Sequence, residues 1–311
     1  MAVTVRELHE TRQTGTHTDI YPTRVQDEAR IIPRKDPIVY GDIDDGPLGQ
    51  QELSRYERDG FLFLTGLFSE SEVEMYRREL RRLDARADNS KRPEVITEPG
   101  SESIRSIFSI HRNDDLFGRL CRDPRVLDVA QQLLGSDVYV HQSRVNYKPG
   151  FTGKEFYWHS DFETWHAEDG MPRMRAVSCS ILLTDNKAFN GALMLIPGSH
   201  RHFISCVGET PEDNHLSSLK AQEVGVPDQE SLSWLVQQGG IHVPEGPAGS
   251  VLFFECNTMH GSNGNITPLP RSNAFFVFNS MENRLQAPYA APRHRPQWLA
   301  ERDHTRALRH L

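Results

Sequence analysis

The chain of 311 residues is long enough to bury a sizeable core, and 37% hydrophobic and 25% charged residues are usual for a globular protein. Its net charge of -8 argues against a nucleic-acid-binding protein, which needs a basic face to neutralise phosphates. There is no apolar run of the roughly 20 residues that span a bilayer, no apolar signal segment at the start, and no C-x-x-C pair. We therefore expect a cytoplasmic protein without disulfides, a cysteine zinc site, a membrane partner or a nucleic-acid partner.

The first segment of the chain is polar, contains several prolines and has little periodicity. It predicts an extended or partly disordered N-terminal arm over residues 1–50. Residues 51–311 are expected to form a single domain. The domain begins with an apolar stretch at 61–68, which is typical of a buried strand followed by a turn.

Two helices are predicted next. Ser69, with Glu72 three residues later, forms a capping box in front of an amphipathic pattern. The second helix is expected from Pro124, a residue favoured in the first turn, to Gly135, a residue typical of helix ends. The chain therefore places helices before its main sheet.

After Gly135 the pattern changes to short apolar runs separated by Gly, Pro, Asn and Asp. The strand candidates are residues 138–148, 175–185, 191–199, 249–256 and 273–281. Such a series, with few helices between its members, predicts an antiparallel sandwich or barrel. The stretch 205–240, with a helix around 229–238, is long for a hairpin connection and predicts a loop insert over the barrel mouth. The expected fold is mainly β with flanking helices on a double-stranded β-helix (jelly-roll, cupin-like) core.

The strand predicted at 138–148 places polar side chains on one face, because residues two apart in a strand point the same way. These are Gln142, Arg144, Asn146 and Lys148. A solvated strand face would explain them equally well. We expect the strand to continue to His159 and Asp161, which would then also project from one face.

His159 and Asp161 form a His-x-Asp pair, which can fill two neighbouring metal coordination sites. A distant histidine would complete a facial triad with open positions for substrate or oxygen. His260 follows a strongly apolar strand and precedes a glycine turn, so it is the favoured third ligand. The competing histidines are His166, His200, His202, His215 and His242.

Arg271 lies eleven residues after His260, at the start of another apolar strand. A facial-triad iron commonly needs a chelating cosubstrate, and a dicarboxylate needs a cation deep in the barrel, where an arginine fork binds it well. A surface arginine after a Pro-Leu-Pro turn is the alternative for Arg271 alone. The triad makes the buried cation the favoured interpretation.

With these residues in place, the chain resembles the non-haem Fe(II), 2-oxoglutarate-dependent dioxygenases of the phytanoyl-CoA dioxygenase-like group, and among them the ectoine hydroxylases. The similar stretches are FYWHSDFETWHAEDGMPRMRAVSCSILLTDN, QSRVNYKPGFTGKEF, RSIFSIHR and NTMHGSNGNITPLPRSNAFFVFNS. The resemblance covers roughly residues 50–300, and its first stretch is highly specific.

The resemblance implies the site residues one by one. The iron ligands would be His159, Asp161 and His260. The residues binding 2-oxoglutarate would be Lys148 and Arg271, with Asn146 and Ser262 as helpers and Phe108 at the edge. The ectoine pocket would be shaped by Gln142, Trp165, Asn273, Phe254, Phe275 and Arg144.

The resemblance also implies the reaction: Fe(II)-dependent hydroxylation of L-ectoine to 5-hydroxyectoine, with O2 consumed and succinate and CO2 released, by a homodimer. Asp161 favours hydroxylation, since related halogenases lack this carboxylate. Alternatives are a hydroxylase of another small zwitterion such as proline, a non-catalytic solute-binding jelly-roll, and a zinc hydrolase. Trp165 has a core tryptophan as its alternative, and Glu163 and His166 are expected to be exposed rather than to support the metal ligands.

Overall fold

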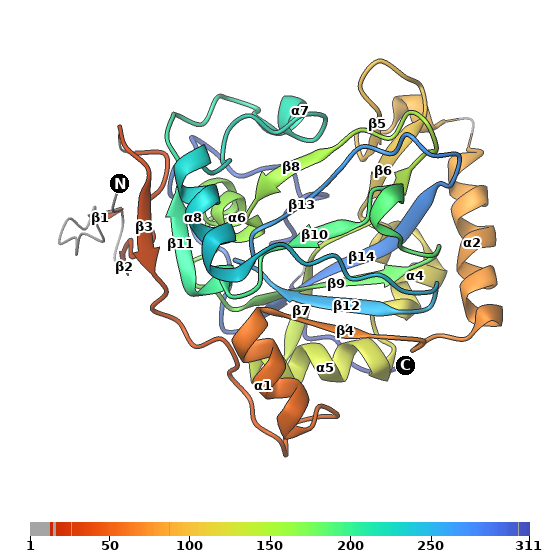
Figure 1. The fold of residues 1–311 in the computed structure, drawn as a ribbon, viewed down its shortest axis with the longest axis horizontal. Helices are drawn as coiled ribbons and strands as arrows, with labels where there is room; N and C mark the ends of the chain where they lie inside the picture. Colours follow the sequence, from red (N-terminus) through yellow and green to blue (C-terminus); the bar gives the residue numbers. More distant parts are fainter. Residues whose placement is uncertain (1–12, 15–16, 26, 87, 304) are drawn as a thin grey trace.

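The computed structural model describes residues 13–14, 17–25, 27–86, 88–303 and 305–311. Its main feature is a seven-stranded antiparallel sheet with the strand order β4-β12-β9-β14-β7-β6-β5 (Figure 1). The strands are β4 (Phe61–Leu64), β5 (Val95–Thr97), β6 (Ile104–Phe108), β7 (Val138–Lys148), β9 (Ala176–Leu182), β12 (Val251–Glu255) and β14 (Arg271–Ser280).

A smaller sheet lies on the other side of the barrel interior (Figure 1). Its strands, in the order β10-β13-β8, are β10 (Leu193–Leu195), β13 (His260–Ser262) and β8 (Phe156–His159). Two further pairs are β3 (Arg30–Pro33) with β11 (His202–Ser205), and β1 (Gln13–Thr14) with β2 (His17–Thr18). The facing antiparallel sheets form the jelly-roll core expected from the sequence.

Helices cover the outer face of the large sheet, with α1 and α5 running beneath its strands in Figure 1. The α-helices that precede β7 in the chain are α1 (Gln50–Asp59), α2 (Glu70–Asp84), α3 (Ile110–Asn113), α4 (Asp115–Leu120) and α5 (Pro124–Leu134). Alternation along β14 divides its side chains: Phe276 and Phe278 pack against the helices, whereas Phe275 and Val277 belong to the core inside the barrel. The inward face of this strand is therefore the one that can reach a ligand.

The capping signals are confirmed. Ser69 Oγ accepts from the Glu72 amide at 3.4 Å, and Glu72 Oε2 accepts from the Ser69 amide at 2.7 Å, so α2 begins with the expected capping box. Helix α5 starts at Pro124 and ends at Gly135, whose φ of 55° lies in the left-handed region that favours glycine. Strand β7 has the predicted bounds, strands β4, β9, β10 and β12 are present but shorter than predicted, and β14 begins two residues earlier than the predicted strand at 273–281.

The expected strand through His159 to Asp161 is wrong. Strand β8 ends at His159, Ser160 is the residue before the next helix, and Asp161 is the first residue of α6 (Asp161–Asp169). Nearly all side chains of this helix are buried, so it has no solvent-exposed face. Its sequence therefore lacks the amphipathic period from which a helix is predicted. His159 and Asp161 still come together, but through a strand end and a helix start.

The structure describes part of the segment 1–50, which was expected to form an extended or partly disordered arm. Residues 1–12 lie outside the described part of the chain, but the later residues of this segment pack into the domain. Strand β3 pairs with β11, and Tyr21 is fully buried against Phe162 and Phe203. The segment is extended, as expected, but its few apolar side chains are spaced too irregularly for the sequence to show that they are buried.

The predicted loop insert contains two helices, α7 (His215–Ser218) and α8 (Gln229–Gly239), the second at the predicted place. Five residues of this insert contribute to the wall of a cavity: Asn214, Ser218, Leu219, Gln222 and Val224. Within the described residues, none of the helices combines the length and the apolar character needed to cross a membrane.

Candidate active site

Three predicted metal ligands meet between the two sheets. One ligating atom of each of His159, Asp161 and His260 lies within 4.8 Å of the others. The two histidines are paired across strands β8 and β13, with ring centroids 4.3 Å apart. From the start of α6, Asp161 places Oδ1 3.7 Å from His159 Nε2 and Oδ2 3.9 Å from His260 Nε2.

Backbone carbonyls orient both histidines. His159 Nδ1 lies 2.7 Å from the Tyr157 carbonyl and His260 Nδ1 lies 2.9 Å from the Thr258 carbonyl. A proton on each Nδ1 leaves the Nε2 lone pairs free for a metal. Burial, with the nearby His260 adding to it, lowers the pKa of His159 to about 4, so the neutral ligand form prevails at neutral pH. Two imidazoles and one carboxylate on one side of the metal fit Fe(II) and leave positions open.

The inner cavity, which lies between the sheets beside His159 and His260, contains two buried cations. Lys148 and Arg271 face each other across β7 and β14, and neither forms an ion pair with any residue that the structure describes. Lys148 Nζ donates to Ser262 Oγ and to the Asn263 carbonyl, both at 2.7 Å, whereas Arg271 Nε has no partner in the described chain. Strands β7 and β14 thus bring a lysine and an arginine without a carboxylate partner to one point, and Ser262 of β13 contacts the lysine.

The pKa values of these cations follow from the same contacts. Burial, and then the charges of Arg271 and Arg105, lower the pKa of Lys148 to about 6. Burial alone lowers the pKa of Arg271 to about 10. Burial therefore disfavours both charged forms, and an anionic ligand would favour them. The inner cavity is built for a carboxylate.

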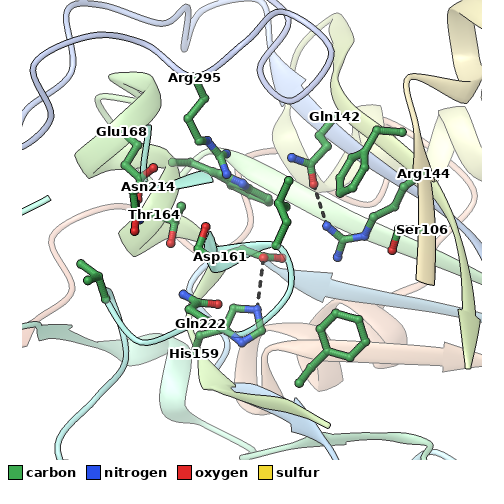
Figure 2. Close-up of a pocket in the computed structure, with 16 residues that line it drawn as sticks. Ser106, Gln142, Arg144, His159, Asp161, Thr164, Glu168, Asn214, Gln222 and Arg295 are labelled. Carbon is green, nitrogen blue, oxygen red and sulfur yellow. Dashed lines mark hydrogen bonds and ion pairs between the residues drawn. The ribbon is translucent and has the colours of Figure 1, made fainter. Parts of the chain in front are cut away.

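The outer cavity opens on the other side of His159 and Asp161 (Figure 2). Arg144 lines it and points towards Gln142, whose Oε1 accepts from Arg144 Nη1 at 2.8 Å. The Arg144 guanidinium lies over the Phe275 ring at 4.4 Å, and burial lowers its pKa to about 10. Its Nε has no hydrogen-bond partner among the described residues. A third buried cation, Arg144, therefore lies beside the metal ligands, where it lines the outer cavity and also borders the inner one.

The residues predicted to bind the cosubstrate and the substrate line two cavities. Phe108, expected beside the cosubstrate, lines the outer cavity with Gln142, Arg144 and Trp165. Three residues expected around the substrate, Asn273, Phe254 and Phe275, line the inner cavity with Asn146, Lys148, Ser262 and Arg271. The strand register explains which residues line which cavity. Phe108 pairs with Arg144 at the outer end of β6, whereas Arg271, Asn273 and Phe275 share the inward face of β14.

Polar residues of the inner wall hold one another. Asn146 Nδ2 donates to Asn273 Oδ1 at 3.0 Å, and Asn273 Nδ2 donates to Ser180 Oγ at 2.6 Å. Asn146 Oδ1 in turn accepts from Ser106 Oγ at 2.8 Å. This chain crosses four neighbouring strands, so it fixes the wall rather than leaving these amides free to bind a charge.

Two residues near the metal ligands were expected to be exposed, and that expectation is wrong. Glu163 is 1% exposed and accepts from Arg24 at 2.9 and 2.7 Å. His166 is equally buried and its Nε2 lies 3.0 Å from Asp19 Oδ1. Their partners come from the N-terminal segment, which the sequence did not connect with the domain. Of the competing histidines, His200 is buried with Nε2 3.1 Å from the Glu57 carbonyl, away from the metal ligands.

The sequence also missed part of the outer cavity. The additional polar residues labelled in Figure 2 are Ser106, Thr164, Glu168, Asn214, Gln222 and Arg295. Two of them, Asn214 and Gln222, lie in the insert that was expected over the barrel mouth. Arg295 forms two bonds to Asp169, at 2.8 and 2.5 Å, and no motif marks it.

The site and the fold agree with the relatives of this chain. Residues 56–273 match the model of the phytanoyl-CoA dioxygenase (PhyH) family, and the chain belongs to that family. It is similar to the ectoine dioxygenase of Bordetella bronchiseptica, 57% identical over 94% of this chain and 96% of the relative. It is also similar to the ectoine dioxygenase of Stutzerimonas stutzeri, 54% identical over 93% and 96% of the two chains. The predicted family is thus confirmed.

Solved structures show the same likeness. EctD from S. alaskensis, crystallised with 2-oxoglutarate and 5-hydroxyectoine, superposes with a TM-score of 0.85 at 48% identity over 94% of this chain and 97% of that chain. The same protein with bound Fe gives a TM-score of 0.83 at 47% identity, again over 94% and 97%. The epimerase SnoN, at 20% identity and a TM-score of 0.60, shares the fold alone.

Proposed function

We infer that this chain is an Fe(II)- and 2-oxoglutarate-dependent dioxygenase that hydroxylates L-ectoine to 5-hydroxyectoine, with O2 consumed and succinate and CO2 released. The observation that carries this inference is a buried His-Asp-His cluster between two cavities, each with its own uncompensated cation. A dianionic cosubstrate and a zwitterionic substrate that bears a carboxylate are the two ligands that this arrangement accommodates. The relatives at 54–57% identity, named ectoine dioxygenases, support the same reaction.

The inner cavity supports 2-oxoglutarate as the cosubstrate. Its keto acid end would chelate the metal at His159 and His260, while its far carboxylate would meet Arg271 and Lys148. A charge-assisted, two-pronged contact with Arg271 fixes both the position and the orientation of that carboxylate. Bound in this way, the ligand supplies the negative charge that the inner cavity lacks.

The outer cavity supports ectoine, a small cyclic amidine that bears a carboxylate. Arg144 is the cation available for the carboxylate, and it is held in place by Gln142. Trp165 is 2% exposed and lines the same cavity, where its ring would stack on the delocalised cation. Such a contact contributes roughly 0.5–2 kcal/mol when it is desolvated. The two ends of one zwitterion are thus matched by two different side chains.

The protein supplies orientation and a dry pocket for the reaction. The chemistry that iron supplies when bound is the activation of O2, one oxygen atom going to succinate and the other to the substrate C–H bond. Ser178 Oγ, 3.3 Å from Asp161 Oδ2, steadies the carboxylate ligand. Phe254 packs its ring 4.9 Å from that of His260 and limits the access of water to the metal site.

The rival functions make different demands on the same residues. A zinc hydrolase would leave Arg271 and Lys148 without a task, and a solute-binding protein would not need the three metal ligands. A hydroxylase of proline or a similar zwitterion needs the same metal site and the same inner cavity. Assembly as a homodimer and a cytoplasmic location belong to the proposal as well, on the strength of the resemblance to the family.

The test is anaerobic reconstitution with Fe(II) and 2-oxoglutarate, followed by exposure to air with ectoine, proline or no substrate. We expect succinate and a product one oxygen atom heavier than ectoine, detected by mass spectrometry. A hydroxylated product from proline but not from ectoine would refute the substrate. Absence of succinate with every substrate would refute the dioxygenase itself.

A further inference from the structure

Arg24 connects three parts of the molecule that are far apart in the sequence. Its Nε and Nη2 donate to both oxygens of Glu163, at 2.9 and 2.7 Å, and its Nη1 donates to Glu168 Oε1 at 2.6 Å. Nη1 also donates to Thr210 Oγ1 at 3.1 Å. The side chains of Arg24, Glu163 and Glu168 are 0–3% exposed, so solvent does not weaken these contacts.

Helix α6 is the first of the connected parts, and it belongs to the active site. It begins with the metal ligand Asp161 and carries Thr164, Trp165 and Glu168 into the wall of the outer cavity. Arg24 forms ion pairs with Glu163 near the start of this helix and with Glu168 near its end. A shift of Arg24 would therefore move the residues of α6 that line the outer cavity.

The second part is the cover loop, which we define as residues 206–228. Side chains of this loop form part of the outer cavity, among them Asn214 and Gln222 (Figure 2). The Arg24 amide donates to the Cys206 carbonyl at 2.8 Å, and Asn214 Nδ2 donates to Glu168 Oε1 at 2.8 Å. The same carboxylate oxygen thus holds Arg24 and the cover loop at once.

The far end of the cover loop closes over the same ion pairs. Gly225 has a φ of 77°, and a Cβ there would collide with Arg24 Nη2 and Glu163 Oε2. Only a glycine lets the loop backbone approach so closely. Arg24 itself has a φ of 55°, which side-chain-bearing residues rarely adopt, and its many contacts hold it there.

We propose that Arg24 is a positioning residue that fastens the cover loop to helix α6 and so shapes the outer cavity for its cyclic substrate. The identity of the substrate rests on the proposed function. Arg24 does not line either cavity, so it acts through Glu163, Glu168 and Thr210. The proposal predicts different effects on the two ligands, because no residue of the cover loop lines the inner cavity.

Two variants test the role from opposite sides. Arg24→Lys keeps the charge but cannot reach both carboxylates and Thr210 with one ammonium group. Thr210→Val removes one side-chain contact between Arg24 and the cover loop and leaves the ion pairs intact, so it does not threaten folding. The matched control is Arg293→Gln. It breaks an exposed ion pair, at 2.8 Å, between Arg293 and Asp213 of the cover loop.

We expect the KM for ectoine to rise roughly tenfold in Arg24→Lys and about threefold in Thr210→Val, as for the loss of one or two buried hydrogen bonds. The KM for 2-oxoglutarate should stay within about twofold in both, and Arg293→Gln should stay within about twofold throughout. A second readout needs no turnover. Lys220 is exposed within the cover loop, and trypsin should cleave after it faster in both variants than in the control.

Two results would overturn the proposal. The first is wild-type KM for ectoine and wild-type cleavage at Lys220 in both variants. The second is a parallel loss of kcat and of both KM values together with a lower Tm in Arg24→Lys, which is the pattern of a purely structural residue. If the wild-type protein does not turn over ectoine, the proposed function fails, and the rate of cleavage at Lys220 alone decides the role of Arg24.

Discussion

The inner and outer cavities share the metal ligand His159, but they differ in whether their buried charged side chains are paired within the protein. In the inner cavity, Lys148 and Arg271 are buried cations with no carboxylate partner in the described chain. Around the outer cavity most buried charges are paired within the protein, as Arg295 is with Asp169, and Arg144 is the exception. Where the protein leaves a buried charge unpaired, a ligand has to supply the opposite charge. The contrast predicts two ligands of different charge, one for each cavity.

Removing the carboxylate ligand should have the largest effect, because Asp161 supplies the one carboxylate of the metal cluster. In Asp161→Ala we expect turnover to fall by at least about 100-fold and bound iron to drop well below one per chain, since two imidazoles hold the metal poorly. Succinate release and iron content measure the two effects. Wild-type turnover in this variant would refute the metal site itself.

The next largest effect should come from Arg271 and should concern one ligand only. Arg271→Gln leaves the far carboxylate of 2-oxoglutarate without its fork, and we expect the KM for 2-oxoglutarate to rise roughly 30-fold or more. The KM for ectoine should change by less than about threefold. Steady-state kinetics with each ligand varied in turn measures both. An equal rise in the two KM values would contradict a division of labour between the cavities.

Arg144 provides the mirror experiment. Arg144→Gln removes the cation of the outer cavity while keeping a hydrogen-bonding side chain, and we expect roughly a tenfold rise in the KM for ectoine. Because Arg144 also borders the inner cavity, the KM for 2-oxoglutarate is the essential control. A larger change for 2-oxoglutarate than for ectoine would place the substrate carboxylate elsewhere.

The smallest effect concerns pH. Lys148 has a pKa lowered to about 6 by burial, then by Arg271 and Arg105, against the weaker opposing charges of Glu98 and Glu155. A bound carboxylate raises that pKa, so above pH 6 binding of 2-oxoglutarate takes up a proton and its affinity falls with rising pH, by less than about tenfold per unit. Calorimetry of 2-oxoglutarate binding across this range measures the slope. Lys148→Met should flatten it, and an unchanged slope would assign the proton to another group.

The sequence predicted the residues of the site better than their arrangement. Local signals were sufficient for strand β7, for the capping box of Ser69 and for helix α5, because each depends on neighbours in the chain. His260 was found because an apolar strand precedes it and a glycine turn follows. Helix α6 was missed because it is buried on all sides, so that its apolar and polar residues show no period.

Long-range pairing accounts for features of the site that the sequence did not show. The burial of Glu163 depends on its ion pair with Arg24, some 140 residues earlier in the chain. No local sequence pattern around either residue predicts this pairing. The distribution of Phe108, Phe254 and Phe275 between the cavities follows from the register of β6, β7 and β14, which alternation along one strand cannot supply.

One measurement tests the central claim most directly: turnover of ectoine and 2-oxoglutarate under 18O2, with both products weighed by mass spectrometry. Two ligands in two cavities around one metal predict one labelled oxygen atom in succinate and one in the hydroxylated ectoine, in equal amounts. Label in succinate without any in a product of ectoine, or oxygen in that product coming from water, would contradict the account.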